Sequence, residues 1–315
     1  MSFIGDRIMI ILVKIIFKTP LHIGEAGIGL EETSQFIHSD TLYSAIFQAW
    51  LRLFGETMSD IVLTSAFPFV GNIYYFPRPL LPIPDFTSDL AIQYGKAIKR
   101  IRFVDYDNFK KWITGMPLDL EEVLNTSDII SKAIISAVQP KVSLDRMTLA
   151  SNLYYVGETV FANSLGVGLF FLVKLKAEQM PKFKAALKFL GEEGIGGRRS
   201  QGYGAFEAEF EDSFYLDEPE TPNAYVTLSL FHPASDGEIR DNLYSYRLVE
   251  RTGWLEGEKA NFGMRHKRVL MIAEGSVFHR RVSGTVVDVA PSGFDAHPVY
   301  RNGLAFIIGA RLEAK

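Results

Sequence analysis

Residues 194–204 read Gly-Ile-Gly-Gly-Arg-Arg-Ser-Gln-Gly-Tyr-Gly, and this glycine-rich segment decides how the rest of the chain is interpreted. Apolar residues recur at helical spacing just before it, in 182–190, and alternate with glutamates just after it, in 206–210. The segment therefore joins the end of a helix to the start of a strand. A dinucleotide-binding loop has the reverse order, and a P-loop needs a Gly-Lys-Ser/Thr sequence that is absent here, so both sites are excluded.

Five glycines in eleven residues let a backbone adopt positive φ and approach a ligand closely. Backbone N–H groups that point into the resulting concavity suit phosphate oxygens, and Arg198 and Arg199 add charge-assisted hydrogen bonds to the same oxygens. The segment thus predicts a phosphate-binding loop. A plain connection with two solvated arginines is the alternative.

The residues on the N-terminal side of this loop predict a strand, a loop and an amphipathic helix. Residues 8–17 form a nearly continuous apolar run, typical of a strand buried on both faces, and 169–175 form another. Ser39 stands where the N-cap of a helix over 39–54 belongs, and Asp40 in its first turn is explained by the helix dipole. Five prolines in 67–84 predict an irregular surface segment there.

The strongest candidate for a domain boundary follows the strand that starts at residue 206. Seven acidic and no basic residues lie in 207–220, and prolines stand at 219 and 222. Beyond it we expect strands at 225–231, 268–273, 284–289 and 304–310, and a short helix at 236–246. Strands outnumber helices in both halves, which predicts an α+β fold of two split β-α-β units rather than a doubly wound parallel sheet.

Composition narrows the possible functions of these 315 residues. Lys and Arg number 33 against 37 Asp and Glu, a net charge of −4, so any contact with phosphates needs local basic patches. The absence of cysteine excludes thiolate metal sites, and no two of the six histidines have helical metal-ligand spacing, so no metal or cofactor is expected. No segment matches a secretory signal or a membrane span, which predicts a cytoplasmic protein without membrane contact.

The spacing of Gly194, Gly196, Gly202 and Gly204 resembles the signature loop of the RAMP superfamily of CRISPR RNA-binding proteins. The resemblance extends over most of the chain and is closest to subunit four of type III-A (Csm) CRISPR effectors. Its further motifs are residues 36–46, 74–80, 99–103 with Trp112, 145–146 leading to 154–158, and 297–306.

This resemblance implies two ferredoxin-like (RRM-like) domains with a long insertion in the first. The N-terminal domain would span 1–218, with the insertion at about 67–160 and the glycine loop at 194–204, and the C-terminal domain 219–315. It also implies a non-catalytic subunit that captures the repeat-derived 5′ handle of the guide RNA. The partners would be the large polymerase/cyclase-like subunit and the backbone RAMP subunit.

The glycine loop, the helix that bears Ser39 and the segment around Arg146 would line the RNA. A second basic patch lies in 259–281, where six Lys or Arg are opposed only by Glu274, and it suits RNA, a protein partner or plain solvation. The RNA-binding residues that we expect are His38, Ser39, Arg146, Gly194, Gly196, Gly197, Arg198, Arg199, Ser200, Gln201, Gly202, Tyr203, Gly204, Arg265, Lys267 and Arg268.

Four questions stay open on the sequence alone. No RNP-type aromatic strand is present, so bases would stack on Tyr154, Tyr155 or Tyr203, although Tyr203 could equally pack into the core. The basic run 96–111 is either a solvated face or a binding surface. A metal-independent repeat endoribonuclease of the same superfamily would need a histidine near the loop, for which His22 and His38 are candidates. The equivalent subunit of a type III-B complex is a further alternative.

Overall fold

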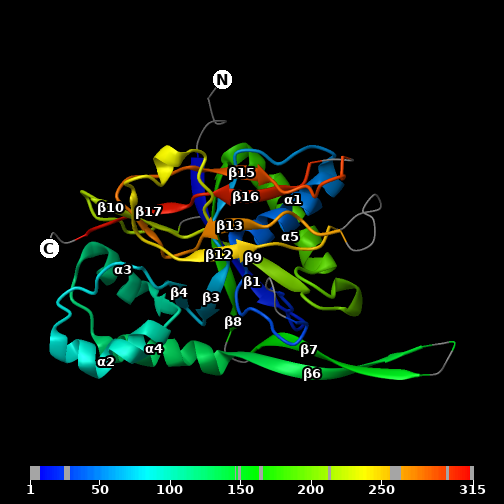
Figure 1. The fold of residues 1–315 in the computed structure, drawn as a ribbon, viewed down its shortest axis with the longest axis horizontal. Helices are drawn as coiled ribbons and strands as arrows, with labels where there is room; N and C mark the ends of the chain where they lie inside the picture. Colours follow the sequence, from blue (N-terminus) through cyan, green and yellow to red (C-terminus); the bar gives the residue numbers. More distant parts are fainter. Residues whose placement is uncertain are drawn as a thin grey trace.

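The computed structural model of the protein describes residues 8–24, 29–145, 147, 150–162, 166–211, 214–255, 264–295 and 298–312. Within these ranges the fold is mixed α/β, with five α-helices around one large and several small antiparallel sheets (Figure 1). This agrees with the predicted α+β class.

The large sheet is organised around β1, as the apolar run predicts. Strand β1 (Ile8–Phe17) pairs antiparallel with β8 (Val167–Lys176) on one side and with β9 (Phe206–Glu211) on the other. Its residues Ile11, Leu12, Val13 and Ile15 are fully buried, because both faces of the strand are covered. From one edge to the other, the strands are β5 (Phe103–Asp105), β4 (Ile73–Pro77), β3 (Phe67–Val70), β8, β1 and β9, and β2 (Val62–Leu63) also pairs with β8.

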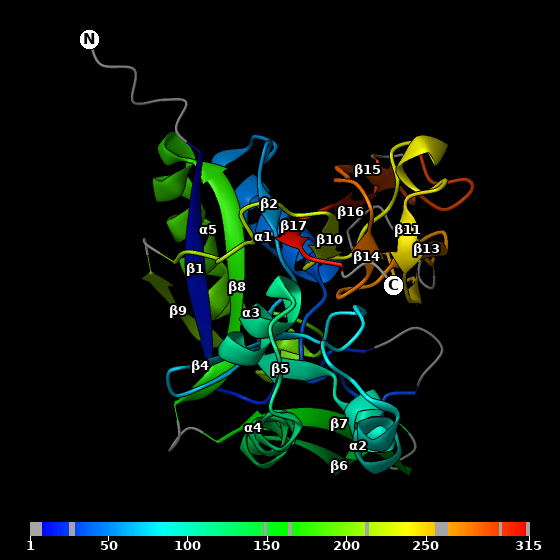
Figure 2. The ribbon, with the colours of Figure 1, turned by 90° about the vertical axis from the view of Figure 1, so that its left-hand side faces the viewer.

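Two helices pack on each other and on one face of this sheet. Helix α1 (Ser39–Phe54) follows β1, and α5 (Met180–Glu193) connects β8 to β9 (Figure 2). Phe171 of β8 contacts Phe183 of α5, whereas the neighbouring Phe170 lies on the opposite face and packs with Phe76. The predicted strands at 8–17, 169–175 and 206–210 and the helices at 39–54 and 182–190 are confirmed.

The prediction of an irregular segment at 67–84 is wrong for its first half. Residues 67–77 form a hairpin of β3 (Phe67–Val70) and β4 (Ile73–Pro77), and β3 also pairs with β8. The prolines are tolerated because of their positions. Pro68 lies before the two residue pairs that join β3 to β4, and Pro77 is the last residue of its strand.

The connection from β4 to β8 forms a helical layer and a projecting hairpin. Its elements are α2 (Ser88–Arg100), β5 (Phe103–Asp105), α3 (Tyr106–Thr114), α4 (Leu120–Ala133), β6 (Ile134–Leu144) and β7 (Ser151–Phe161). Strands β6 and β7 extend away from the body of the molecule (Figure 1). Val142 and Leu153 are cross-strand partners on this hairpin, and both side chains are more than half exposed.

The second half is built from short strands. The four-stranded sheet β11-β14-β10-β17 contains β10 (Ala224–Thr227), β11 (Leu243–Ser245), β14 (Val277–Phe278) and β17 (Ile307–Ala310). Two separate ladders join β12 (Leu248–Arg251) to β13 (Val269–Ile272) and β15 (Gly284–Asp288) to β16 (Tyr300–Leu304). All four predicted strand regions are present, although most are shorter than expected.

The prediction of a helix at 236–246 is wrong. Only a 3-10 turn over Asp236–Glu238 forms, and β11 follows it. Asp241 adopts a φ of +54°, which no α-helix can continue through. The carboxylate of Glu238 accepts hydrogen bonds from the backbone of Ala234, Ser283 and Gly284, so this turn is stabilised by contacts outside itself. Other 3-10 turns occur at Ala177–Gln179 and Arg199–Gln201.

One hydrophobic core runs through both halves. Val226, Val277, Phe306 and Ile308 pack in the same buried cluster as the residues of β1 and β8. Phe306 lies under the ammonium group of Lys174 on β8, 4.3 Å from Nζ to the ring centre. Its carbonyl accepts from Leu228 N, and its own N–H donates to Ser229 Oγ. Phe306 therefore connects the small sheet to the large one.

We expect Phe306→Ala to lower the free energy of unfolding by about 3–5 kcal/mol, because it removes a buried aromatic ring shared by both halves. Both halves should unfold together in urea, with coincident transitions by tryptophan fluorescence and far-UV circular dichroism. Tyr300→Ala is the control, since its side chain is half exposed. Two separate transitions, only one of them shifted, would contradict the shared core.

Candidate nucleic-acid interface

The glycine loop begins where α5 ends and adopts positive φ at five positions. Gly194, Gly196, Gly202 and Gly204 have φ between +76° and +91°, and Arg198 has a φ of +60°. A positive φ favours glycine, and four of these five residues are glycine. This requirement explains the spacing of the glycines in the sequence.

Close packing explains three of these glycines further. A Cβ atom at Gly194 would lie 2.6 Å from the carbonyl oxygen of Tyr203, and one at Gly196 would lie 2.5 Å from that of His22. A Cβ at Gly204 would collide with the backbone of Ile195. At Gly202 no atom lies within 4 Å of such a Cβ. The loop is thus folded tightly on itself and on the segment after β1.

The backbone amides of the loop mostly bind the protein rather than face outward. Seven of them donate to carbonyl oxygens of the chain, namely those of Gly194, Ile195, Gly197, Gln201, Gly202, Tyr203 and Gly204. The prediction that the loop amides form a phosphate cradle is wrong for these seven, because folding the loop already uses them.

The outward part of the loop is its tip, residues 198–202. Arg199, Ser200, Gln201 and Gly202 are exposed, and Arg198 is half-buried. Arg198 Nη1 donates to Gln201 Oε1 at 2.8 Å, and the guanidinium carbon lies 5.3 Å from the ring centre of Tyr154 on β7. The tip therefore presents cationic, hydroxyl and amide side chains from a constrained backbone.

The sequence left two roles open for Tyr203, base stacking and packing into the core, and the structure shows that it is packed. Its side chain is only 7% exposed, and its hydroxyl donates to Glu158 Oε2 at 2.9 Å. Burial and the Glu158 carboxylate raise the pKa of this hydroxyl. Tyr155 is 44% exposed and Tyr154 half-buried, so the candidates for base stacking are these two residues of β7.

His22 supports the loop from below. Its Nδ1 donates to the carbonyl oxygen of Gly157 at 2.7 Å, and its own carbonyl accepts from Gly197 N at 2.9 Å. The backbone of Leu21 pairs with Thr159 of β7. The loop, the segment after β1 and β7 consequently form one hydrogen-bonded unit.

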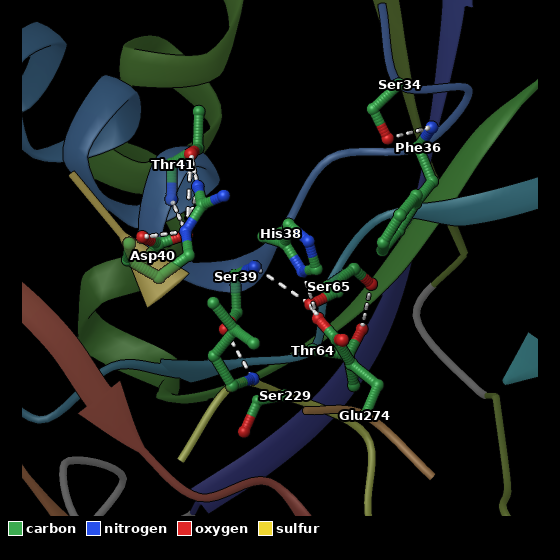
Figure 3. Close-up of polar contacts among 12 residues, drawn as sticks. Ser34, Phe36, His38, Ser39, Asp40, Thr41, Thr64, Ser65, Ser229 and Glu274 are labelled. Atoms are coloured by element: carbon green, nitrogen blue, oxygen red, sulfur yellow. Dashed lines mark hydrogen bonds and ion pairs between the residues drawn. The ribbon is translucent and has the colours of Figure 1, made fainter. Parts of the chain in front are cut away.

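His38 and Ser39 do not lie on this surface, which corrects their predicted role in RNA contact. Their side chains are 4% and 2% exposed. Figure 3 shows His38, Ser65 and Glu274 converging beside the start of α1. His38 Nδ1 lies 2.7 Å from Glu274 Oε1, Ser65 donates to the same oxygen, and Ser39 Oγ accepts from Leu230 N at 2.9 Å.

Ser39 is also not the N-cap. Helix α1 begins at Ser39, and its N-cap residue is His38, whose side chain makes no capping bond. The N–H of Ser39 instead donates to Ser65 Oγ at 2.8 Å. Burial alone would raise the pKa of Glu274, but His38 and the hydrogen bond from Ser65 lower it overall.

The sequence interpretation missed the main role of Asp40, which is a buried ion-pair network. Its carboxylate is buried and accepts from Arg251 Nε at 2.9 Å, from Arg251 Nη2 at 3.0 Å and from Arg301 Nη1. Burial would raise the pKa of Asp40, but the two guanidinium groups outweigh it and hold this pKa well below its usual range. The helix dipole is therefore a minor reason for an acid at this position.

The densest part of the C-terminal basic patch, residues 265–268, is beside the β12–β13 ladder, whereas Arg280 and Arg281 follow β14 and Lys259 lies outside the described residues. Arg265 stacks on the exposed Trp254, 4.2 Å from guanidinium carbon to ring centre, and Arg268 lies 3.6 Å from Glu250. Lys267 is exposed. Arg146, which we expected to contact RNA, lies outside the described residues.

The described residues contain no group of three His, Asp or Glu side chains arranged to hold a metal ion. None of their helices combines the length and the apolar character that a membrane crossing requires.

Comparison with known families gives two matches along the chain. The model of the RAMP superfamily matches residues 14–207, and that of the CRISPR Csm4 C-terminal domain matches residues 220–310.

Two relatives are named CRISPR system Cms protein Csm4. The protein from Thermococcus onnurineus (strain NA1) is 30% identical over 291 residues, covering 87% of this chain and 91% of the relative. The protein from Mycobacterium tuberculosis (strain ATCC 25618 / H37Rv) is 30% identical over 290 residues, covering 89% and 91%.

Solved structures with the same fold include two assemblies. A Csm1-Csm4 cassette in complex with cA4 contains a chain that matches with a TM-score of 0.65 and 23% identity, over 97% of this chain and 99% of that one. A Csm3-Csm4 subcomplex of the type III-A CRISPR-Cas interference complex contains one with a TM-score of 0.64 and 20% identity, over 96% and 99%.

We expect Gly204→Ala to destabilise the protein more than Gly202→Ala does. Both positions have positive φ, which costs a non-glycine residue roughly 1–2 kcal/mol. Only Gly204 also faces backbone atoms too close for a Cβ. Thermal unfolding of the two variants measures the difference, and equal shifts would contradict the tight folding of the loop.

Asp40→Asn should lower the free energy of unfolding by about 3–5 kcal/mol at neutral pH, because it leaves two buried arginines without their counter-charge. Asp89→Asn is a matched control, since Asp89 is also in the first turn of a helix but is exposed. A loss no larger than that of Asp89→Asn would contradict the role of the ion pairs.

The loss of unfolding free energy caused by Asp40→Asn should depend on pH. A carboxylate whose pKa is lower in the folded than in the unfolded state contributes stability above its unfolded pKa, about 3.9 for aspartate. That contribution is lost as the pH falls toward the folded value. The difference between wild type and variant should therefore be constant at neutral pH and shrink below about pH 4, as measured by urea unfolding.

Proposed function

Because the chain belongs to the RAMP superfamily and, within it, to the Csm4 family, we propose that it is a non-catalytic RNA-binding subunit of a type III-A CRISPR interference complex. In this role it captures the repeat-derived 5′ handle of the guide RNA. Such a complex works where its guide RNA is made, in the cytoplasm.

The observation that carries the RNA-binding part of the proposal is the exposed tip of the glycine loop. Arg198, Arg199, Ser200 and Gln201 project from a backbone that seven internal amide bonds hold in place. Arginine binds phosphate oxygens in a planar, bidentate manner, and side chains held in advance lose less entropy on binding. Tyr154, whose ring lies beside the Arg198 guanidinium, offers an aromatic face for an unstacked base next to the tip, and the exposed Tyr155 follows it on β7.

This arrangement favours contact with the sugar-phosphate chain over reading of sequence. Arginine contacts to phosphates set the register of an RNA but do not identify its bases. Recognition of particular handle nucleotides then depends on stacking and on base edges near β7.

The partners that we propose follow from the similar assemblies. One contains Csm1 with Csm4 and the other Csm3 with Csm4. We infer that this chain likewise bridges the large polymerase/cyclase-like subunit to the backbone RAMP subunits.

The strand order supports a ferredoxin-like N-terminal domain over 1–218. In β9-β1-β8-β3, with α1 after β1 and α5 between β8 and β9, every neighbouring pair is antiparallel. That is the pattern of a split β-α-β unit. Because β3 is one of its four strands, we move the start of the insertion expected at about 67–160 to residue 73. We keep 219–315 as the second domain, although its described residues contain no α-helix.

Arg198→Ala combined with Arg199→Ala should weaken binding of a labelled guide RNA at least tenfold, because two phosphate contacts are lost. The measurement is fluorescence anisotropy with the full chain and, in parallel, the amount of guide RNA that copurifies with its complex. Lys182→Ala combined with Lys188→Ala on α5 removes the same charge from exposed positions outside the loop. Equal binding by the loop variant and the control variant would contradict the proposal.

Incubation of the same RNA with the protein in EDTA tests whether the subunit is non-catalytic. We expect the RNA to be recovered at full length. Specific cleavage that His22→Ala abolishes would favour an endoribonuclease, because His22 is the histidine beneath the loop. His38 is committed to Glu274. Mass spectrometry of the copurifying subunits distinguishes a type III-A from a type III-B complex.

A further inference from the structure

Arg78 and Arg247, from distant parts of the chain, both contact the turn that carries Glu274, and Arg102 is hydrogen-bonded to Arg78 through the backbone. We call Arg78, Arg102 and Arg247 the arginine cluster. The N–H of Arg78 donates to the carbonyl of Arg102 at 2.9 Å, and Leu80 N donates to Gly275 O at 2.8 Å. Arg247 Nη2 donates to Glu274 O of the same turn at 3.2 Å.

The side chains of the cluster are held in position. Gly275 has a φ of +82°, and a Cβ there would collide with the carbonyl of Arg78, so the turn lies directly against this arginine. Arg78 Nε donates to Ile101 O at 3.2 Å. The guanidinium of Arg102 lies over the ring of Phe36, 4.1 Å from its centre.

The positive charge of Arg78 and Arg247 is not compensated by the residues that the structure describes. Within them, neither guanidinium has a carboxylate within 4 Å. The carboxylate of Glu274, on the same turn, is buried and already accepts from His38 and Ser65. Burial and the charge of Arg247 together lower the pKa of Arg78. Two like charges held side by side cost free energy, which a bound anion would recover.

We propose that the arginine cluster binds phosphate groups of an RNA strand, at a second contact site built by different elements from the glycine loop. This inference rests on the proposed RNA-binding function. A guanidinium has five N–H donors, and Arg78 and Arg247 each use one of them inside the described protein. The remaining donors suit bidentate bonds to phosphate oxygens.

The surrounding charge favours RNA over an isolated anion. Lys96, Lys99 and Arg100 are exposed on the last turns of α2, directly before Arg102 in the sequence. Cations spaced along a path match a strand that carries one charge per nucleotide. This assigns the basic run at 96–111, at least in its first half, to binding rather than to a solvated face.

Arg247→Gln is the primary test, because Arg247 is exposed and the substitution keeps a hydrogen-bonding side chain. The assay is anisotropy of a 5′-fluorescein single-stranded guide RNA with the full chain at several salt concentrations. We expect about tenfold weaker binding, and a slope of log K against log salt that is smaller by about 0.7 for each lost phosphate contact. Arg78→Lys keeps the positive charge but removes the planar guanidinium that forms bidentate bonds, and it should weaken binding several-fold.

The thermal midpoint separates binding from a structural role. Removing Arg247 relieves repulsion with Arg78, so the midpoint of Arg247→Gln without RNA should equal or exceed that of wild type. A lower midpoint would overturn the proposal in favour of a structural role. Arg52→Gln is the control for both readouts, because Arg52 is an exposed arginine in the last turn of α1, far from His38 at its start.

The outcomes distinguish this inference from the proposed function. If wild type does not bind the RNA, the proposed function fails. If wild type binds and the Arg198/Arg199 variant is impaired, but Arg247→Gln keeps the wild-type affinity and salt slope, only the arginine cluster is overturned. Unchanged RNA binding with loss of a copurifying subunit would likewise overturn it and assign the cluster to an acidic protein partner.

Discussion

The carboxylate of Asp40 holds together segments of the chain that lie more than 200 residues apart. Its bonds to Arg251 and Arg301 attach the end of β12 and the start of β16 to the first turn of α1. A buried charge is stable only with well-placed partners, so these bonds tolerate little change in how the two halves meet. The turn with Glu274 is attached to the residues flanking that helix end, through His38 and Ser65, and Arg247 and Arg78 lie against this turn. The arginine cluster therefore depends on the same junction.

The glycine loop consists of a packed interior and an exposed tip. Gly194, Gly196 and Gly204 pack against neighbouring backbone, and seven of the loop amides donate to carbonyl oxygens of the chain. Its polar and charged side chains, Arg198 to Gln201, face outward. The glycines therefore determine where the neighbouring side chains point, and in the proposed RNA-binding role they would act through those side chains rather than by contact of their own.

Local patterns predicted three strands of the large sheet, β1, β8 and β9, and its two main helices, because the apolar run of β1 and the periodicity of α1 are determined by neighbours in the sequence. The hairpin at 67–77 was missed because prolines are harmless at strand ends, which only the pairing reveals. The helix at 236–246 was overridden by contacts of Glu238 with residues 283 and 284. The bonds of Asp40 had no local signal at all, although two of the resemblance motifs, 36–46 and 297–306, contain Asp40 and Arg301.

The projecting hairpin of β6 and β7 has a consequence for how the cell must handle this subunit. Val142 and Leu153 are apolar neighbours on a two-stranded ladder that extends beyond the compact body. Long, exposed, apolar strands of this kind promote aggregation when they remain uncovered. An excess of the free chain is therefore expected to self-associate through this hairpin.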